Sequence, residues 1–211
     1  LRGSKMDFER YEFTLDCDYP HWLTDLRHIE VIYEFLMAND FTRVAEIGSY
    51  SGLSTAAFIE ALNQGKDFKL HIAEPNPTRQ LEALLSMCKK PDNVVLHVKT
   101  GENLLEHWTG FDFVFIDGNH NIDAAGAELL MVLRHEIPTV MAHDTNLLSL
   151  DSNYDGEGAE LLGRVLKSHK DYYWVEDKEK RPDEHTERGL FFASKRKDKH
   201  EIAKRIFEEL C

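Results

Sequence analysis

The sequence predicts a doubly wound α/β domain built on a mostly parallel, seven-stranded sheet. Between residues 43 and 168, short apolar runs alternate with stretches of helical period, which is typical of parallel strands joined by right-handed helical crossovers. Two later strand-like runs, at 172–175 and 190–193, have no helix between them and therefore predict an antiparallel hairpin at the end of the sheet. Acidic residues follow several of the strands, at the edge where such sheets bind ligands.

The length of 211 residues favours a single domain, because one core commonly serves chains of up to roughly 200 residues. Residues 1–5 are typical of a cloning remnant, so we expect the natural chain to start at Met6. Within 6–211 we expect an N-terminal helical cap over residues 6–40 and an α/β core over 41–211.

The composition excludes several classes of protein. Apolar residues make up 42% and charged residues 30% of the chain, which suits a folded domain. The net charge of −13 repels phosphate backbones and anionic lipids, so we expect neither a nucleic acid nor a membrane partner. The three cysteines are widely spaced and the chain has neither a long apolar span nor a signal-peptide core, which together favour the cytoplasm.

The first elements are expected as follows. Residues 22–37 predict a helix that precedes the sheet, and residues 43–47 predict its first strand. A turn at 48–52 leads into a helix over 53–63, which Gly65 closes at a C-cap position. Residues 68–73 predict the second strand.

The next helix has start and stop signals on both sides. Asn76 followed by Pro77 is typical of an N-cap and a first helical residue. An apolar stripe at helical spacing follows, and Lys89-Lys90-Pro91 ends the helix. The stripe consists of Leu81, Leu84, Leu85 and Cys88.

The remaining elements complete the alternation. Residues 94–98, 113–116 and 139–142 predict strands, and the middle one is apolar throughout, as expected for a strand buried on both faces. Helices are expected at 101–108, from 122 to 133 and at 157–168. The two late strands are joined by a charged linker at 177–188 that we expect to be exposed, and a polar helix over 197–210 ends the chain.

The turn after the first strand has the chemistry of a ligand loop. Its spacing, from Glu46 through Gly48 to Gly52, is E-x-G-x-x-x-G, and Gly48 allows a sharp turn on which a ligand can lie. Tyr50 stands where a dinucleotide fingerprint has glycine, so the loop argues against a pyrophosphate cofactor. Glu74, which follows the second strand, is placed to accept hydrogen bonds from a ribose. Asn103 or Glu102 lies where an adenine amino group could be met.

These motifs resemble those of class I methyltransferases. The segment EIGSYSGLS at 46–54 is similar to the first motif of catechol and caffeoyl-CoA O-methyltransferases, and FIDGNH at 115–120 and MAHDT at 141–145 resemble a bacterial family that includes macrolide-sugar O-methyltransferases. The resemblance implies the Rossmann-like methyltransferase fold and S-adenosylmethionine as the cofactor. The predicted cofactor-binding residues are Glu46, Gly48, Ser49, Tyr50, Gly52, Glu74, Asn103 and Asp117.

Polar residues gather after the fourth and fifth strands: Asp117, Asn119 and His120, then His143 and Asp144. Asp117 ends an apolar strand where packing gives no reason for a carboxylate. His120 either acts as general base or caps the following helix, whereas His143 at a strand end is more typical of a structural histidine.

By the same resemblance, Asp117 and Asp144 would hold a divalent cation such as Mg²⁺, and His120 would be the base. Asp117 and His120 are thus the predicted catalytic residues. The similar plant and animal enzymes have Asp-Asn where this chain has Asp144-Thr145, with Asn146 one position later, so the third metal ligand is left open.

Three functions remain as alternatives. The first is S-adenosylmethionine-dependent O-methylation of a small hydroxylated molecule, with a homodimer as the form that the resemblance implies. The second is an NAD-type oxidoreductase on a Rossmann-like fold, and the third is a non-catalytic binding module.

Overall fold

The computed structural model describes residues 6–18, 24–145, 157–178 and 189–211. Its centre is one seven-stranded sheet with the strand order β3-β2-β1-β4-β5-β7-β6. All neighbouring strands are parallel except β7, which is antiparallel to both β5 and β6. The predicted fold class is therefore confirmed. The strands are β1 Arg43–Ile47, β2 Lys69–Ala73, β3 Val94–His97, β4 Phe113–Ile116, β5 Thr139–His143, β6 Tyr173–Asp177 and β7 Leu190–Ser194.

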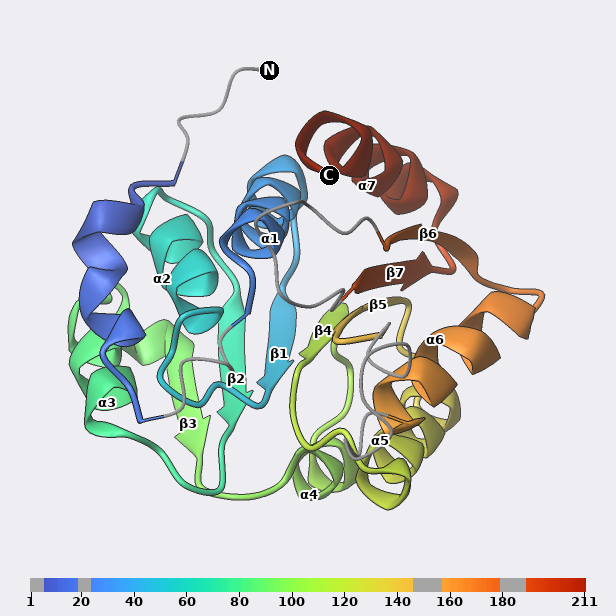
Figure 1. Ribbon diagram of the computed structural model, residues 1–211, viewed down its shortest axis with the longest axis horizontal. Helices are drawn as coiled ribbons and strands as arrows, with labels where there is room; N and C mark the ends of the chain where they lie inside the picture. The colour runs from blue at the N-terminus through green and yellow to red at the C-terminus, as the bar shows by residue number, and fades with distance from the viewer. Residues whose placement is uncertain (1–5, 19–23, 146–156, 179–188) are drawn as a thin grey trace.

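Helices cover both faces of this sheet (Figure 1). On one face α1 packs against α2 and α7, and on the other α5 packs against α4 and α6. The described helices are the 3-10 helices η1 Phe8–Leu15 and η3 Pro91–Asn93, and the α-helices α1 Leu26–Ala38, α2 Thr55–Asn63, α3 Arg79–Ser86, α4 Gly101–His107, α5 Ile122–Arg134, α6 Glu157–Ser168 and α7 Lys197–Leu210.

Strand β4 shows why the central strands are apolar throughout. Phe113 and Phe115 enter the core beneath α1 and α2, whereas Val114 and Ile116 enter the core beneath α4 and α5. Every residue of β4 is buried, because successive side chains point to opposite faces and both faces are covered. The strand can therefore carry polar chemistry only beyond its end, at Asp117.

Two local predictions are wrong. The N-cap of α3 is Thr78, whose hydroxyl accepts the amide of Leu81, and the helix starts at Arg79 rather than at Pro77. Asn76 does not cap the helix; its backbone N–H donates instead to Glu74. Helix α3 ends at Ser86, so Cys88 lies beyond it. For the helix predicted over 22–37, residues 22 and 23 lie outside the described residues.

The parallel arrangement determines where a ligand can bind. The loops that follow β1, β2, β4 and β5 leave the same edge of the sheet, because these strands are neighbours and point in the same direction.

None of the helices in the described ranges has the length and apolar character that crossing a lipid bilayer requires.

Candidate active site

The loop after β1 packs tightly against the end of β4. Gly48 has a φ of +78°, and a Cβ built there would lie 2.3 Å from the backbone oxygen of Asp117. Its N–H donates to the carbonyl of Ala73 at 3.0 Å, which joins the loop to the end of β2 as well. A side chain at position 48 would collide with main-chain atoms, so glycine is required here for contact as well as for conformation.

Glu74 holds this loop in place. One carboxylate oxygen accepts the backbone N–H groups of Ser49 at 3.1 Å and Tyr50 at 2.9 Å, and the other accepts the N–H of Asn76 at 2.9 Å. The residue is only 8% exposed, so it is not a solvated turn residue. Tyr50 has a φ of +45°, a conformation that this hydrogen bond helps to maintain.

Glu46 lies behind the loop. The side chain is fully buried, and its two oxygens accept the hydroxyls of Ser54 at 2.7 Å and Thr55 at 2.8 Å. Burial raises the pKa of the Glu46 carboxyl to about 8, against the lowering effect of these two hydroxyls. Glu46 therefore connects β1 to the start of α2.

Two serine hydroxyls suit a polar ligand at the loop. Ser49 Oγ and Ser51 Oγ are buried and have no hydrogen-bond partner among the described residues. Buried hydroxyls normally find partners, so these two atoms are available to the polar groups of a cofactor. Gly52 completes the loop: a Cβ there would lie 2.8 Å from Leu84 Cδ2 on α3.

Asn103 lies on the first turn of α4, next to the N-cap Thr100. Its side-chain amide donates to Thr100 Oγ1 at 2.8 Å in an exposed position. The neighbouring Glu102 is exposed. The structure thus leaves both residues accessible at the predicted adenine position.

Sequence reasoning missed Glu128 on α5. It is 4% exposed, and burial raises the pKa of its carboxyl to about 8. It approaches the same edge as the loop, because a Cβ on Gly101 would lie 2.5 Å from Glu128 Oε1. A single glutamate within the apolar stripe of α5 was the available signal.

Asp117, His120 and Asp144 come together, and their ligand atoms lie within 4.8 Å of one another. His120 Nε2 lies 2.9 Å from Asp144 Oδ2 and 3.8 Å from Asp117 Oδ1. Burial lowers the pKa of His120, but the carboxylates of Asp144 and Asp117 outweigh it and raise the pKa above its usual value. The capping interpretation of His120 is wrong, because Asn121 is the N-cap of α5 and accepts the amide of Ala124.

Asp144 is held in an unusual conformation between two histidines. Its φ is +58°, and a non-glycine residue adopts that region at a cost of about 1–3 kcal/mol. His143 and His120 lower the pKa of the Asp144 carboxyl against the opposing effect of burial. Such strain clusters at functional sites, which supports a functional interpretation of Asp144.

His143 is buried directly behind these carboxylates. Its Nδ1 lies 3.4 Å from Asp117 Oδ1 and 3.2 Å from Asp144 Oδ1. On the other side, its Nε2 lies 2.9 Å from His28 Nδ1. The site therefore extends through the sheet edge to helix α1.

The contribution of α1 was not predicted. Thr24, just before the helix, donates its hydroxyl to Asp117 Oδ2 at 2.7 Å, and His28 lies one turn further along. The spacing of Asp25 and His28 matches the D-x-x-H spacing of Asp117 and His120, which is a signal that could have found this pair.

Asp177 was predicted to lie in an exposed linker, and this is wrong. The residue ends β6 and is 4% exposed. It accepts a hydrogen bond from His28 Nε2 at 2.9 Å and pairs with Arg27 at 3.1 Å. Asn146, the alternative third metal ligand, lies outside the described residues, as does most of the charged linker.

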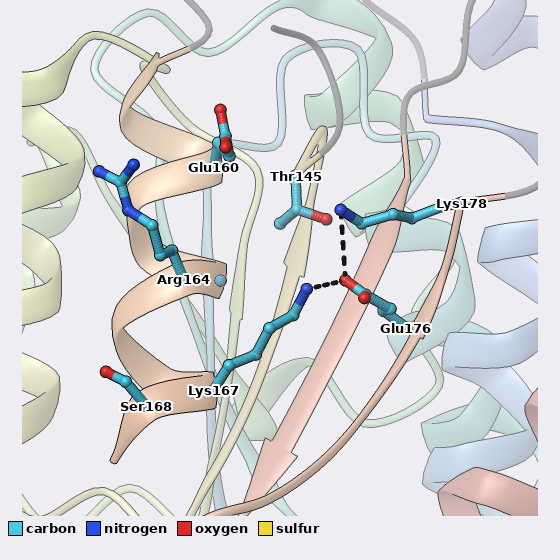
Figure 2. Close-up of a pocket in the computed structure, with 8 residues that line it drawn as sticks. Thr145, Glu160, Arg164, Lys167, Ser168, Glu176 and Lys178 are labelled. Atoms are coloured by element: carbon cyan, nitrogen blue, oxygen red, sulfur yellow. Dashed lines mark hydrogen bonds and ion pairs between the residues drawn. The ribbon is translucent and has the colours of Figure 1, made fainter. Parts of the chain in front are cut away.

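A separate hollow of about 360 Å³ lies between α6 and the end of β6, next to Thr145. Figure 2 shows Lys167 and Lys178 pointing toward Glu176, with which both form ion pairs. The lining of this hollow includes Thr145, but it includes neither Glu74 nor any residue of the 48–52 loop. The hollow is therefore distinct from the predicted cofactor site.

Comparison with known proteins gives a sequence match and several structural ones. Residues 45–145 match a family described as a methyltransferase domain. A search of curated proteins gives no match. The sequence match covers the loop after β1, Glu74 and the Asp117–Asp144 group together.

Three solved structures illustrate the likeness of fold, each covering 92% of this chain. An O-methyltransferase, TomG, from Streptomyces achromogenes, involved in tomaymycin synthesis and solved with S-adenosylmethionine, has 17% identity, a TM-score of 0.71 and 92% of its own chain covered. The methyltransferase PaMTH1 of Podospora anserina, bound to S-adenosylhomocysteine, has 16% identity, a TM-score of 0.70 and 90% coverage. An O-methyltransferase from Bacillus cereus, also with S-adenosylhomocysteine, has 13% identity, a TM-score of 0.70 and 92% coverage.

Proposed function

We propose that this chain, whose residues 45–145 match a methyltransferase domain, transfers a methyl group from S-adenosylmethionine to a hydroxyl group of a small molecule. The observation that carries the proposal is the pairing of His120 with Asp144 at 2.9 Å, beside Asp117, next to the loop after β1. A histidine between carboxylates at this edge is equipped to take a proton from a hydroxyl group.

The cofactor would lie on the loop formed by residues 48–52. When bound, S-adenosylmethionine supplies an electrophilic methyl group on a sulfonium. Ser49 and Ser51 have hydroxyls without a described partner, and Glu74 lies at the end of β2 where a ribose would be met. Tyr50, Gly52 and Asn103 complete the proposed binding surface.

His120 handles the proton in this proposal. With Nε2–H donated to Asp144, the ring offers Nδ1 as the atom that accepts the hydroxyl proton. Asp144 then stabilises the imidazolium through the existing hydrogen bond, as a carboxylate does for a catalytic histidine. The acceptor oxygen would be left with an electron pair for the methyl carbon, whose bond to sulfur would break with its electrons staying on sulfur, so that S-adenosylhomocysteine leaves. The proton would stay on His120 until solvent removes it.

Asp117 and Asp144 have the oxygen chemistry of a Mg²⁺ site, and they remain the predicted ligands of a divalent cation. Their four oxygens already face donors from the chain: Thr24, His120 and, at two positions, His143. A cation at this position would have to replace some of these contacts. Titration of the protein and S-adenosylhomocysteine with millimolar Mg²⁺ tests for it.

The acceptor is proposed to be a small molecule rather than a nucleic acid. The net charge of −13 opposes the approach of a phosphate backbone. The homodimer and the cytoplasmic location stay predictions, and analytical ultracentrifugation tests the first.

Calorimetry with S-adenosylhomocysteine and NAD tests the function. We expect S-adenosylhomocysteine to bind and to raise the melting temperature, and we expect NAD to do neither, because the loop lacks the dinucleotide fingerprint. A panel of phenols, catechols and sugars with S-adenosylmethionine then identifies an acceptor by release of S-adenosylhomocysteine. Tight NAD binding without binding of S-adenosylhomocysteine would support the oxidoreductase alternative and overturn the proposal.

A further inference from the structure

Asp25, His28 and His143 form a second cluster, on the side of His143 that faces away from Asp117. Asp25 is the N-cap of α1, His28 lies in its first turn, and His143 ends β5. The two histidines are 0% and 1% exposed. One ligand atom of each residue lies within 4.8 Å of the others.

The carboxylates on the outer sides of the two rings determine where their protons lie. His28 Nε2 lies 2.9 Å from Asp177 Oδ2, and His143 Nδ1 lies 3.2 Å from Asp144 and 3.4 Å from Asp117. An ionised carboxylate can only accept hydrogen bonds, so His28 Nε2 carries its proton, and the two carboxylates beside His143 favour a proton on its Nδ1. If both rings are neutral, the two inner nitrogens, His28 Nδ1 and His143 Nε2, are both unprotonated and each carries a lone pair.

These two inner nitrogens, His28 Nδ1 and His143 Nε2, lie 2.9 Å apart. Two lone pairs at that distance in a buried site repel each other unless a positive charge lies between them. Asp25 Oδ2 points to the same place, at 3.4 Å from His28 Nδ1 and 3.8 Å from His143 Nε2. Two nitrogens and one carboxylate oxygen thus converge on one point.

We propose that Asp25, His28 and His143 bind a divalent transition-metal ion of the Zn²⁺ class, at a site distinct from the predicted Asp117–Asp144 cation site. Metal–ligand bonds of about 2.0–2.1 Å in tetrahedral geometry separate the ligand atoms by roughly 3.3 Å, and the three observed separations bracket that value. Imidazole nitrogens select Zn²⁺, Co²⁺ or Fe²⁺ over Mg²⁺. The inference does not rest on the proposed methyl transfer.

The surroundings support a metal site. Metal-binding histidines usually donate their other ring N–H to a carboxylate, which orients the ring and raises its basicity. His28 has that arrangement with Asp177 at 2.9 Å, and His143 Nδ1 faces Asp144 at 3.2 Å and Asp117 at 3.4 Å. Asp177 is itself fixed by Arg27 at 3.1 Å.

Another histidine pair of the same protein provides the contrast. His71 Nδ1 and His97 Nε2 lie 3.0 Å apart with stacked rings. The pKa of His71 is lowered to about 4 by burial and then by the positive neighbours His97, Arg43 and Lys69, so no carboxylate controls its proton. One N–H donated to one lone pair satisfies that pair, and His97 therefore provides a matched control.

The experiment uses the full chain, stripped with a chelator and titrated with Co²⁺ and then Zn²⁺. We expect one equivalent of Co²⁺ with visible d–d absorption bands, displacement by Zn²⁺, and no displacement by a thousandfold excess of Mg²⁺. His28→Gln and Asp25→Asn should abolish the bands, Asp177→Asn should weaken binding about 10–100-fold, and His97→Gln should leave it unchanged.

Two outcomes overturn the proposal. If the wild-type chain binds neither Co²⁺ nor Zn²⁺ at micromolar concentration, a proton is the charge between the rings. Consistent with a proton, the carboxylates of Asp144 and Asp117 raise the pKa of His143 well above its usual value although burial lowers it. If binding survives Asp25→Asn but is lost in His120→Gln, the metal lies in the Asp117–His120–Asp144 group instead. Asp25→Asn keeps the test valid even if His28→Gln does not fold.

Discussion

At the scale of single residues, the site depends on carboxylates with several partners. Asp144 contacts two histidines, Asp117 contacts a threonine and two histidines, and Glu74 accepts three backbone N–H groups. Each of these acids therefore has a positioning task in addition to any role toward a ligand. Substitutions at them should be judged on stability and binding separately.

His120→Ala should lower turnover by roughly 10²–10⁴-fold, the usual contribution of a general base. Binding of S-adenosylhomocysteine should change little, because the His120 side chain pairs with Asp144 and Asp117. The rate of S-adenosylhomocysteine release with an acceptor from the panel measures the effect. His169→Ala, in the turn after α6, is the control, and equal rates for the two variants would contradict the role of His120.

Glu74→Ala should weaken S-adenosylhomocysteine binding by about 2–3 kcal/mol. It should also destabilise the fold by about 1.5–3 kcal/mol, because three amides lose a charged acceptor. Calorimetry and urea unfolding separate the two effects. Glu106→Ala, on the exposed side of α4, should change neither, and an unaltered affinity in Glu74→Ala would restrict Glu74 to holding the loop.

At the scale of elements, the strands and the bounds of α6 and α7 could be predicted closely, but the ends of α3 could not. β4 is apolar at every position because both faces are covered, and that pattern is visible in the sequence. The start of α3 depends on which residue the chain uses as a cap, and Glu74 already uses the N–H of Asn76. Only the folded arrangement shows that Thr78, rather than Asn76, is the N-cap of α3.

The same reasoning explains what was found and missed in the site. Asp117 and Asp144 follow strands, so their meeting could be predicted from the parallel order. Thr24 lies 93 positions before its partner Asp117, and no local pattern shows that α1 docks beside β5. The roles assigned to the predicted cofactor and catalytic residues stay predictions.

Gly48→Ala tests the loop after β1 as an element. The positive φ adds about 1–2 kcal/mol for a residue with a Cβ, and contact with the backbone of Asp117 adds about 1–3 kcal/mol of overpacking. Gly65→Ala is matched to it, because Gly65 also has a positive φ but open space around it. Urea unfolding should show the larger loss for Gly48→Ala, and equal losses would show that the contact with Asp117 relaxes.

At the scale of the whole molecule, one sheet has a separate hydrophobic core on each of its two faces. The predicted domain division into a cap over 6–40 and a core over 41–211 stays a prediction, although α1 contributes buried residues to the same core as α2 and α7. Buried histidines make the stability of this single unit depend on pH.

His71 should make the protein less stable in mild acid. Its pKa in the folded state is lowered from 6.5 to about 4, first by burial and then by His97. The unfolded chain therefore takes up the proton first, so stability is complete above pH 6.5 and falls as the pH drops from 6.5 to about 4. Melting temperatures across this range should fall more steeply for the parent than for His71→Gln, and parallel curves would contradict this account.

The position of β7 has a consequence for the order in which the protein folds during synthesis. β7 lies between β5 and β6 in the sheet, although it is the last strand along the chain. Until the ribosome has released residues 190–194, β6 has no neighbour to pair with and β5 has an open, apolar edge. Chains fold from the N-terminus as they emerge, so the nascent protein carries an unfinished sheet edge, a known hazard for aggregation. Completion of the sheet is therefore a late event in the life of each molecule.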